Sequence, residues 1–276
     1  MRFESNTTEK LIKSLIHNVQ GLSFGSAQKA LRMGKVKVNG KRTKDNIAIS
    51  SGDIIEIYGF NTSRPQVPII YEDNNILIVG KPAGIECATR DKSSSNTYSL
   101  EEIFEDKGAI VVHRLDRLTE GLVILARNKD IARKFEQYFR EKHIKKTYIA
   151  ATKEPLKPGK FVAFLKKDSS KGLVSISDTP QEDYKEIITE ILSVEPKNTY
   201  NLSTILLHTG RTHQIRAHLS HLGAPIIGDT KYGSKLDSYN FYALTAHKLH
   251  FDIPNDELGI NHLTPTFSPT WIDKII

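Results

Sequence analysis

A short segment near the middle of the chain carries the residue types best suited to chemistry. Residues 113–120 read His-Arg-Leu-Asp-Arg-Leu-Thr-Glu and lead into an apolar run at residues 121–126. Asp116 stands between Arg114 and Arg117, whose positive charges favour an ionised carboxylate. An acid presented at the mouth of a cleft, just ahead of a buried strand, is a candidate catalytic group. A surface ion pair gives the same local pattern and remains the alternative.

Three other segments accompany this one in a defined order. Residues 81–84 read Lys-Pro-Ala-Gly, and residues 145–150 read Lys-Lys-Thr-Tyr-Ile-Ala. Residues 207–219 read Leu-His-Thr-Gly-Arg-Thr-His-Gln-Ile-Arg-Ala-His-Leu, and the pattern continues to Gly228 and Asp229. With these segments, residues 68–251 resemble the pseudouridine synthases that modify large-subunit ribosomal RNA and some transfer RNAs.

The resemblance implies an isomerisation of uridine in RNA. The C1′–N1 bond breaks, the base turns, and C1′ joins to C5, so no electrons are exchanged. The matching positions imply that Asp116 is the reacting carboxylate, either as a nucleophile or as a base at C2′. Tyr148 would stack on the uracil, and its hydroxyl would reach the reacting carbon. Arg211 is the expected partner of the acid, with Arg216 and Arg114 as alternatives.

The target base must be extruded from its stack before it can react, and this costs a few kcal/mol. The loop around Asp116 is well placed in sequence to hold the opened RNA, because arginine both stacks and binds phosphate. His113 also fits a hydrogen-bonded core histidine, which is the favoured interpretation. The candidate substrate-binding residues are His113, Arg114, Arg117, Thr209 and Arg216.

Nothing in the sequence indicates a cofactor or a metal. There is no glycine-rich phosphate or dinucleotide motif, and Cys87 is the single cysteine. His208, His213, His218 and His221 are spaced by five, five and three residues. The two-histidine zinc helix needs a spacing of four with a glutamate between, and that pattern is absent.

Two positions depart from the family pattern. Glu120 stands where many relatives have serine, and it adds a negative charge near the candidate site. Residues 85–89 lack the histidine and proline that are common in relatives after the Lys-Pro-Ala-Gly turn, which leaves the rim of the pocket and substrate choice open. Cys87 is best interpreted as a small buried hydrophobe.

The elements that must position these residues follow from apolar spacing. Helical periodicity begins at Leu11 after a possible Thr8 cap, and Ser26 is placed to cap a second helix that stops at Gly34. Asn39-Gly40 indicates a hairpin and precedes a strand at residues 54–58. In the remainder, residues 69–71, 76–79, 123–126, 161–165, 174–176, 187–192 and 202–207 are predicted strands. Helices are predicted after Asn128 and after Gly210.

Positive charge is concentrated at the N-terminus. Residues 1–64 hold seven lysines and four arginines against five acids, which is +6 of the chain's net charge of +7. Two helices followed by a small antiparallel sheet resemble the alpha-L RNA-binding module, in which cations bind phosphates with little base reading. The candidate RNA-binding residues are Lys29, Arg32, Lys35, Lys37, Lys41, Arg42 and Lys44.

Composition is that of a globular protein, with 276 residues, 38% of them hydrophobic and 26% charged. No apolar run approaches the roughly 18 residues of a membrane span. We expect a cytoplasmic monomer with an alpha-L domain at residues 1–60, a linker at 61–68 and a catalytic domain at 69–276. The expected fold class is α+β, a pseudouridine synthase fold with a central mixed or antiparallel sheet.

Three functions compete. The first is a pseudouridine synthase, whose target is expected to be 23S ribosomal RNA rather than transfer RNA. The second is a non-catalytic RNA-binding or ribosome-assembly factor on the same fold, although a pure binder has no need of Asp116, Tyr148 and Arg211 together. The third is a nucleoside hydrolase or RNA glycosylase that uses the same acid, which release of free uracil would reveal.

Overall fold

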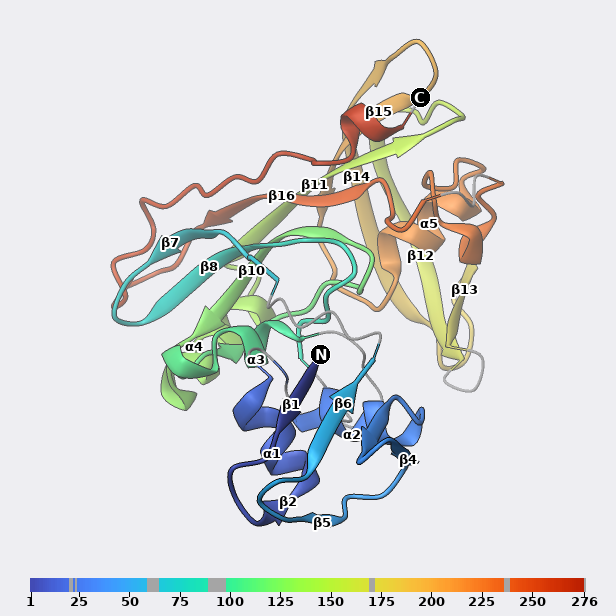
Figure 1. The fold of residues 1–276 in the computed structure, drawn as a ribbon. Coiled ribbons are helices and arrows are strands. Elements are labelled where there is room, and N and C mark those ends of the chain that lie inside the picture. The colour runs from blue at the N-terminus through green and yellow to red at the C-terminus, as the bar shows by residue number, and fades with distance from the viewer. Residues whose placement is uncertain are drawn as a thin grey trace. The chain divides into compact units, whose positions relative to one another are not determined.

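The computed structural model describes residues 1–19, 22, 24–58, 65–88, 98–168, 172–235 and 239–275. The chain divides into two compact units: Met1–Gln66 with Ala88–Asp106, and Val67–Cys87 with Lys107–Ile276 (Figure 1). The expected domain boundaries stay a prediction. Residues 61–64 of the expected linker and residues 90–97 of the expected polar loop lie outside the described residues.

The smaller, N-terminal unit, where the structure describes it, combines short strands with three helices, of which α1 and α2 contribute to its own apolar core. Its elements are β1 (Arg2–Glu4), β2 (Glu9–Lys10), α1 (Leu11–Asn18), α2 (Phe24–Arg32), β3 (Val36–Val38), β4 (Lys41–Thr43), β5 (Ala48–Ile49), β6 (Ile54–Ile57) and α3 (Leu100–Ile103). Within the described residues, β1-β6-β3-β4 form an antiparallel sheet and β2 pairs with β5. Leu11, Leu15, Ala27 and Ala30 are fully buried between the helices and the sheet.

Local signals predicted this unit in outline but not its helix starts. Asn39 and Gly40 both have positive φ, at 50° and 76°, as the hairpin turn requires. Lys10, the residue before α1, gives the helix no side-chain cap. Instead the side-chain oxygen of Asn46, far along the chain, accepts the Ile12 N–H at 2.9 Å. The expectation that Ser26 precedes the second helix as its cap was wrong, because α2 begins two residues earlier, at Phe24.

The larger unit contains the remaining elements. They are β7 (Ile69–Glu72), β8 (Ile76–Lys81), β9 (Ile110–Val111), β10 (Glu120–Ala126), α4 (Lys129–Arg140), β11 (Ile144–Thr152), β12 (Gly159–Asp168), β13 (Leu173–Ser177), β14 (Lys185–Pro196), β15 (Asn201–Leu207), α5 (Gln214–His221) and β16 (Leu244–Phe251). Short 3-10 turns lie at Thr230–Tyr232 and Ile272–Lys274, and a third, Glu105–Lys107, spans the point in the sequence where the smaller unit ends and the larger one resumes. Asn128 caps α4 as predicted, since its side chain accepts N–H groups from Asp130 and Ile131.

One large sheet organises this unit. Its order over the described residues is β13-β12-β14-β15-β11-β16-β10-β8-β7, with β9 on β10. The pairing of β10 with β16 is parallel, and the other described pairs in this sheet are antiparallel. At this junction Gly121 has a φ of 119°, and a Cβ there would lie 2.4 Å from the Ala246 oxygen, so glycine permits the close approach.

Each helix of the larger unit covers a different part of the sheet. Ile131 and Phe135 of α4 pack on β8, β10 and β16, whose residues form an apolar core. Ala217 of α5 packs in a separate core with residues of β12, β13 and β14. The prediction of an α+β fold with a mixed sheet is confirmed. Among the described residues, no helix is long and apolar enough to cross a membrane.

Candidate active site

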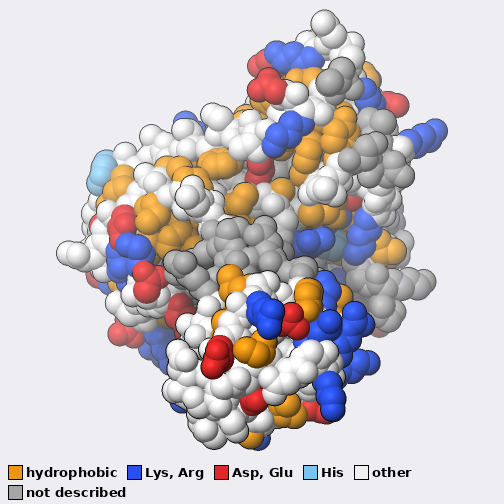
Figure 2. Space-filling view, viewed as in Figure 1, with side chains coloured by type: hydrophobic (Ala, Val, Ile, Leu, Met, Phe, Trp, Pro, Cys, Tyr) orange, Lys and Arg blue, Asp and Glu red, His pale blue; other side chains and the backbone are white. Residues whose placement is uncertain are grey.

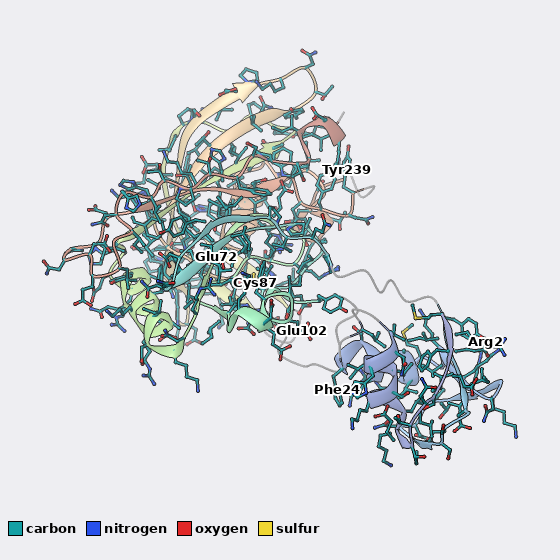
Figure 3. The ribbon with its side chains drawn as sticks, turned by 60° about the vertical axis from the view of Figure 1, so that its left-hand side comes forward. Arg2, Phe24, Glu72, Cys87, Glu102 and Tyr239 are labelled. Carbon is teal, nitrogen blue, oxygen red and sulfur yellow. The ribbon has the colours of Figure 1, made fainter. Side chains whose placement is uncertain are left out.

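Asp116 lies in the loop between β9 and β10, and neighbouring segments hold this loop in place. The Leu115 N–H donates to the Cys87 sulfur at 3.2 Å, and Thr119 N–H donates back to the Asp116 carbonyl at 3.0 Å. Cys87 is buried, as the sequence predicted, and Figure 3 shows it inside the larger unit. The Asp116 side chain keeps 27% of its surface exposed. The loop therefore presents the carboxylate while its backbone is fixed.

A buried lysine supports the same loop from the end of β8. The Lys81 ammonium donates to the carbonyls of Ile85, Pro82 and Arg117 at 2.8, 3.1 and 3.1 Å. The Gly84 N–H also donates to the Arg117 carbonyl, at 2.7 Å. Burial lowers the pKa of Lys81 to about 8, although the charges of Cys87, Asp116 and Glu120 act in the opposite direction. Lys81 thus joins the Lys-Pro-Ala-Gly turn to the loop that carries the candidate acid.

Arg216 of α5 makes the ion pair with Asp116. Its Nη1 donates to the Asp116 carboxylate at 2.7 Å, while Nε and Nη2 donate to the two Asp229 oxygens at 2.6 and 2.9 Å. The Arg216 side chain is 3% exposed and that of Asp229 is fully buried. A planar guanidinium can satisfy both carboxylates at once, which a lysine cannot do. Asp229 therefore fixes the direction from which Arg216 reaches the acid.

Two aromatic rings hold the same guanidinium. Its central carbon lies 4.0 Å from the ring centroid of Tyr242 and 5.0 Å from that of Tyr232. Burial lowers the pKa of Arg216, but hydrogen bonds and charge from Asp229, and then from Asp116, raise it above its ordinary value. The cation is therefore permanent, and its position is set by contacts on several sides.

His213 stands at the start of α5 and faces the same acid. Its Nε2 lies 3.8 Å from Asp116, and its Nδ1 is 2.8 Å from the Tyr232 hydroxyl. The residue has a φ of 55°, a left-handed conformation that costs energy for a side chain of this size. Burial lowers the pKa of His213, while the Asp116 charge opposes that shift. The sequence weighed His213 only as a metal ligand and missed this placement.

Tyr148 lies on β11, opposite Ile205 of β15, at a register shift in the pairing with β16. Its side chain is buried. Burial raises the pKa of the phenol well above its ordinary value, and the negative charge of Asp116 raises it further. The structure thus brings the candidate acid and the candidate tyrosine within electrostatic reach, and it holds the tyrosine in its neutral form.

The expected pairing of Arg211 with Asp116 is corrected by this geometry. Among the described arginines, the one in contact with the acid is Arg216, whereas Arg211 is exposed in the turn before α5. The Arg211 N–H donates to the Gln214 side chain at 3.1 Å. Thr209 serves the same turn, because its hydroxyl donates to Gln214 at 2.9 Å and accepts the Ile188 N–H at 2.9 Å.

The loop residues around Asp116 differ in what they contact. His113 accepts the Ile124 N–H at 3.1 Å, and its ring packs edge-on against Phe139. The pKa of His113 is lowered to about 3, mainly by burial and to a lesser extent by the positive charge of Lys146. These contacts are those of a core histidine. Arg114 and Arg117, on either side of the acid in the sequence, are exposed.

Comparison with known proteins places this site in a family. Residues 75–221 match the RNA pseudouridylate synthase family. The chain belongs to this family. It is 34% identical to the ribosomal large subunit pseudouridine synthase C of Buchnera aphidicola subsp. Baizongia pistaciae, over 92% of this chain and 91% of the relative. It is 33% identical to the protein of the same name from Rickettsia bellii, over 80% and 82% of the two chains.

Solved structures of pseudouridine synthases share the fold. Human RNA pseudouridylate synthase domain containing 1 superposes with a TM-score of 0.60 and 24% identity, over 78% of this chain and 88% of the human chain. Human RNA pseudouridylate synthase domain containing 4 gives a TM-score of 0.59 over 73% and 88%. The expected fold family is therefore confirmed, and the protein is an RNA pseudouridine synthase.

Glu120 of this synthase forms hydrogen bonds with the C-terminal segment. Its buried carboxylate accepts the Thr270 N–H at 2.7 Å, the Thr270 hydroxyl at 2.6 Å and the Thr245 hydroxyl at 2.8 Å. The Trp271 indole N–H donates to the same Thr245 hydroxyl at 2.7 Å. This set, here named the C-terminal latch, explains how a charge next to the active-site loop is satisfied.

The histidines that suggested a metal site have different partners. His208 lies 2.7 Å from Glu190, His218 lies 3.0 Å from the Thr189 hydroxyl, and His221 lies 2.8 Å from Asp178. Within the part of the chain that the structure describes, no group of three or more potential metal ligands lies together.

The basic residues of the N-terminal unit gather around β3 and β4. Figure 2 shows lysine and arginine side chains concentrated on one side of this unit. Arg32, Lys41, Arg42 and Lys44 are exposed, and Lys35 and Lys37 are half-buried. Lys37 lies opposite Arg42 of β4 on one side and opposite Glu56 of β6 on the other, so its like-charge neighbour is balanced by an acid. The side chain of Lys29 lies outside the described residues.

Proposed function

We propose that this synthase converts specific uridines of large-subunit ribosomal RNA into pseudouridine. Support for the target comes from the similarity to synthases named for the ribosomal large subunit, which extends over nine-tenths of both chains in one case. Transfer RNA remains the alternative target. We expect the protein to act as a cytoplasmic monomer, with the N-terminal unit serving as an alpha-L RNA-binding module.

The observation that carries the proposed chemistry is the Asp116–Arg216–Asp229 arrangement. Asp116 is partly exposed, and its partner arginine is fixed by a second, buried carboxylate. Such a group can attack the sugar or remove a proton from C2′ without any search for its position. Arg216 would hold the carboxylate ionised until it reacts. As the C1′–N1 bond breaks, its electrons leave with the uracil, and Asp116 becomes an ester at C1′ or, in the other route, a carboxylic acid that holds the C2′ proton. In this role Arg216 replaces Arg211 as the candidate partner.

Tyr148 is proposed to act on the base. A neutral phenol on a buried strand offers a ring face to the uracil and a hydroxyl for the reacting carbon. Arg114 and Arg117 are proposed to hold the opened RNA at the rim, because both are exposed cations beside the acid. His113 and Thr209 fit structural roles better than substrate binding, since their side chains already accept the backbone N–H groups of Ile124 and Ile188.

The test of this function uses Asp116→Asn. This change keeps the size of the side chain but removes the nucleophile or base. We expect tritium release from 5-tritiated uridine in ribosomal RNA to fall more than tenfold, which corresponds to a barrier rise above about 1.4 kcal/mol. RNA affinity and thermal stability should change little. Tyr148→Phe should likewise lose turnover while it keeps affinity.

Three results would separate the alternatives. Pseudouridine mapping of RNA from cells with and without the protein identifies the target, and lost sites confined to transfer RNA would redirect the assignment. Free uracil without pseudouridine would indicate a glycosylase. If Asp116→Asn retained full turnover, the chemistry would have to reside elsewhere in the chain.

A further inference from the structure

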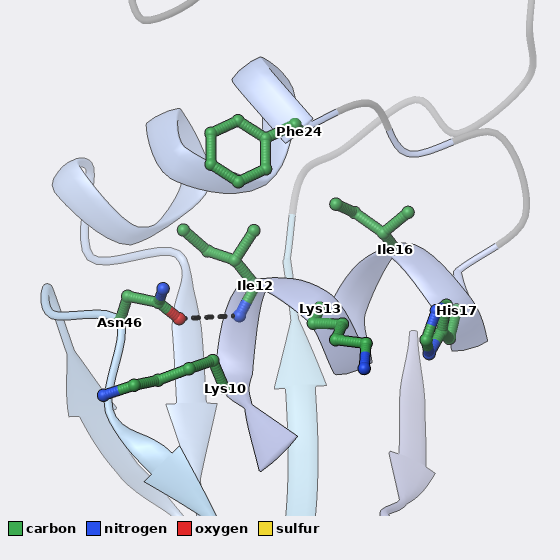
Figure 4. A pocket seen from close by; sticks show the side chains of 7 residues that line it. All are labelled: Lys10, Ile12, Lys13, Ile16, His17, Phe24 and Asn46. Atoms are coloured by element: carbon green, nitrogen blue, oxygen red, sulfur yellow. Dashed lines mark hydrogen bonds between the residues drawn. The ribbon is translucent and has the colours of Figure 1, made fainter.

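A pocket of about 380 Å³ opens on the N-terminal unit and shares no residue with the candidate active site or with the basic set around β3 and β4. Its volume is at the lower end of the range of small-molecule sites, roughly 300–1,000 Å³. Figure 4 shows it between α1, α2 and the segment before β5. The lining residues are Lys10, Ile12, Lys13, Ile16, His17, Phe24 and Asn46.

The interior of this pocket is apolar and ends in an aromatic ring. Phe24, from the start of α2, lies opposite Ile12 and Ile16 of α1 (Figure 4). Phe24 is 50% exposed, whereas Ile12 is almost fully buried beneath it. A single exposed apolar side chain needs no explanation, but a half-exposed ring over a concave apolar surface is suited to take up a flat partner.

The rim of the pocket is basic. Lys13 and His17 each lie 3.6 Å from the Glu9 carboxylate, so that acid partly balances them. Lys10 has no ion pair among the described residues, and its side chain extends from the pocket in Figure 4. The side-chain oxygen of Asn46 accepts the Ile12 N–H. Its side-chain NH2 group has no partner among the described residues and can donate to a ligand.

We propose that this pocket binds one unstacked nucleobase of the substrate RNA, with the base stacked on Phe24 and its phosphate beside Lys10. The inference rests on the proposed function, because the occupant is the RNA that the enzyme modifies. An aromatic face joined to a free cation is the combination with which proteins hold single-stranded nucleic acid. The pocket would select little among the four bases, since an aromatic ring and one amide can bind any of them.

Charge decides between this occupant and an apolar side chain of a partner protein. Residues 1–64, which contain the whole pocket, have a net charge of +6, against −3 for residues 88–106 of the same unit. The unit therefore remains positive, and a polyanion is attracted to the segment that carries the pocket. An apolar peptide would gain from burying its side chain on the apolar surface, but it would not be attracted by the positive charge. The pocket also gives the N-terminal unit a means to distinguish single strands from duplex, which the phosphate-binding basic set lacks.

The test compares Phe24→Ala and Phe24→Trp in the full-length protein. The probes are a mixed-sequence single-stranded RNA of twelve nucleotides and a blunt duplex of the same sequence. Stacking on one aromatic ring contributes about 1–3 kcal/mol, so Phe24→Ala should weaken single-strand binding at least about fivefold and leave duplex binding within about twofold. Phe24→Trp should retain the wild-type affinity. Met33→Ala removes an equally exposed apolar side chain outside the pocket and should have no effect.

Two further measurements make the result decisive. Lys10→Gln should lower the slope of log affinity against log salt by about 0.7 for the single strand, as expected for one lost phosphate contact. Photolysis of wild-type protein bound to 5-iodouridine RNA should give a crosslink on the peptide that contains Phe24. A crosslink found only on other peptides would overturn the proposed base site. So would an equal loss of affinity for the single strand and the duplex in Phe24→Ala.

Failure of the pocket and failure of the proposed function give different results. If the wild-type enzyme makes pseudouridine but Phe24→Ala binds the single strand normally, the pocket is not a base site and the function stands. If no pseudouridine forms but Phe24→Ala still loses single-strand affinity selectively, the pocket stands as an RNA site and the enzymatic assignment falls.

Discussion

Arg216 joins two carboxylates and is itself buried, so it offers a sharp test at the level of one residue. Arg216→Lys keeps the positive charge but cannot contact Asp116 and both oxygens of Asp229 at once. We expect turnover to fall at least about a hundredfold, or roughly 2.7 kcal/mol of barrier, because the acid loses its fixed orientation. Single-turnover rates at saturating RNA measure the effect.

Arg211→Lys is the matched control, because it makes the same exchange in the same motif at an exposed position. We expect its turnover to stay within about threefold of wild type, or roughly 0.7 kcal/mol. If Arg211→Lys were the more damaging change, the contact of Asp116 with Arg216 would be structural and the original expectation for Arg211 would be restored.

His218 gives the protein a pH-dependent stability. Burial lowers its pKa from 6.5 to about 4, so the folded chain resists a proton that the unfolded chain accepts. The free energy of unfolding should therefore fall as pH drops from about 6.5 to about 4, by at most about 1.4 kcal/mol per pH unit from this group. In urea titrations across that range, the stability advantage of wild type over His218→Gln should shrink toward low pH. A constant difference would show that His218 does not contribute.

Sequence motifs were enough to single out the candidate acid and the candidate tyrosine, whereas the arginine that contacts the acid could not be predicted from them. Arg211 and Arg216 lie in one motif, and the choice between them depends on which face α5 buries. Arg211 falls in the exposed turn, and Arg216 falls on the buried face above Asp229. Tyr232 and Tyr242 carried no local signal at all, because their role arises only when distant segments meet over one guanidinium.

Among the elements, the C-terminal latch joins the start of β10 to the segment after β16. Its Glu120 carboxylate accepts three hydrogen bonds in a buried setting. Glu120→Gln presents one acceptor and two donors there, so we expect a loss of about 1–3 kcal/mol in the free energy of unfolding. Amide exchange at residues 268–272 should accelerate in the variant.

Glu190→Gln serves as the control for this change. Glu190 contacts one polar side chain, His208, and is partly exposed, whereas Glu120 is buried and accepts three hydrogen bonds. We expect a loss below about 1 kcal/mol, as for other solvent-exposed pairs. An equal loss in both variants would mean that the latch is no more important than a surface contact.

Strands with continuous apolar runs were predictable, but their order in the sheet was not. β10 and α4 follow from the apolar residues 121–126 and the Asn128 cap, which are local features. β16 was missed, since Leu244–Phe251 interleaves polar residues and histidines with its apolar ones. Its place is set by packing between β10 and β11 and by the close approach at Gly121, neither of which a local pattern encodes.

Over the whole molecule, positive charge is expected to anchor RNA through the N-terminal unit. Joint replacement of Lys41, Arg42 and Lys44 by glutamine should weaken binding to long structured RNA and reduce the salt slope by about 2 to 3, at roughly 0.7–0.9 per phosphate contact. Turnover on a short RNA at saturation should persist, because the candidate active site lies in the other unit.

A variant with the same loss of charge in the larger unit provides the comparison. Lys157, Lys160 and Lys167 are exposed there, and their joint replacement by glutamine changes the net charge equally. We expect a smaller change in slope. Equal slopes for both variants would mean that RNA responds to total charge and that the N-terminal unit is not a distinct anchor.

The central position of β16 also determines when the sheet can be completed during synthesis. During synthesis, residues 244–251 leave the ribosome after every other strand of the sheet described here. Until they arrive, β11 with Tyr148 and β10 behind the Asp116 loop have no strand between them and remain separate halves. We therefore expect the candidate acid and the candidate tyrosine to come together only after residues 244–251 have been made.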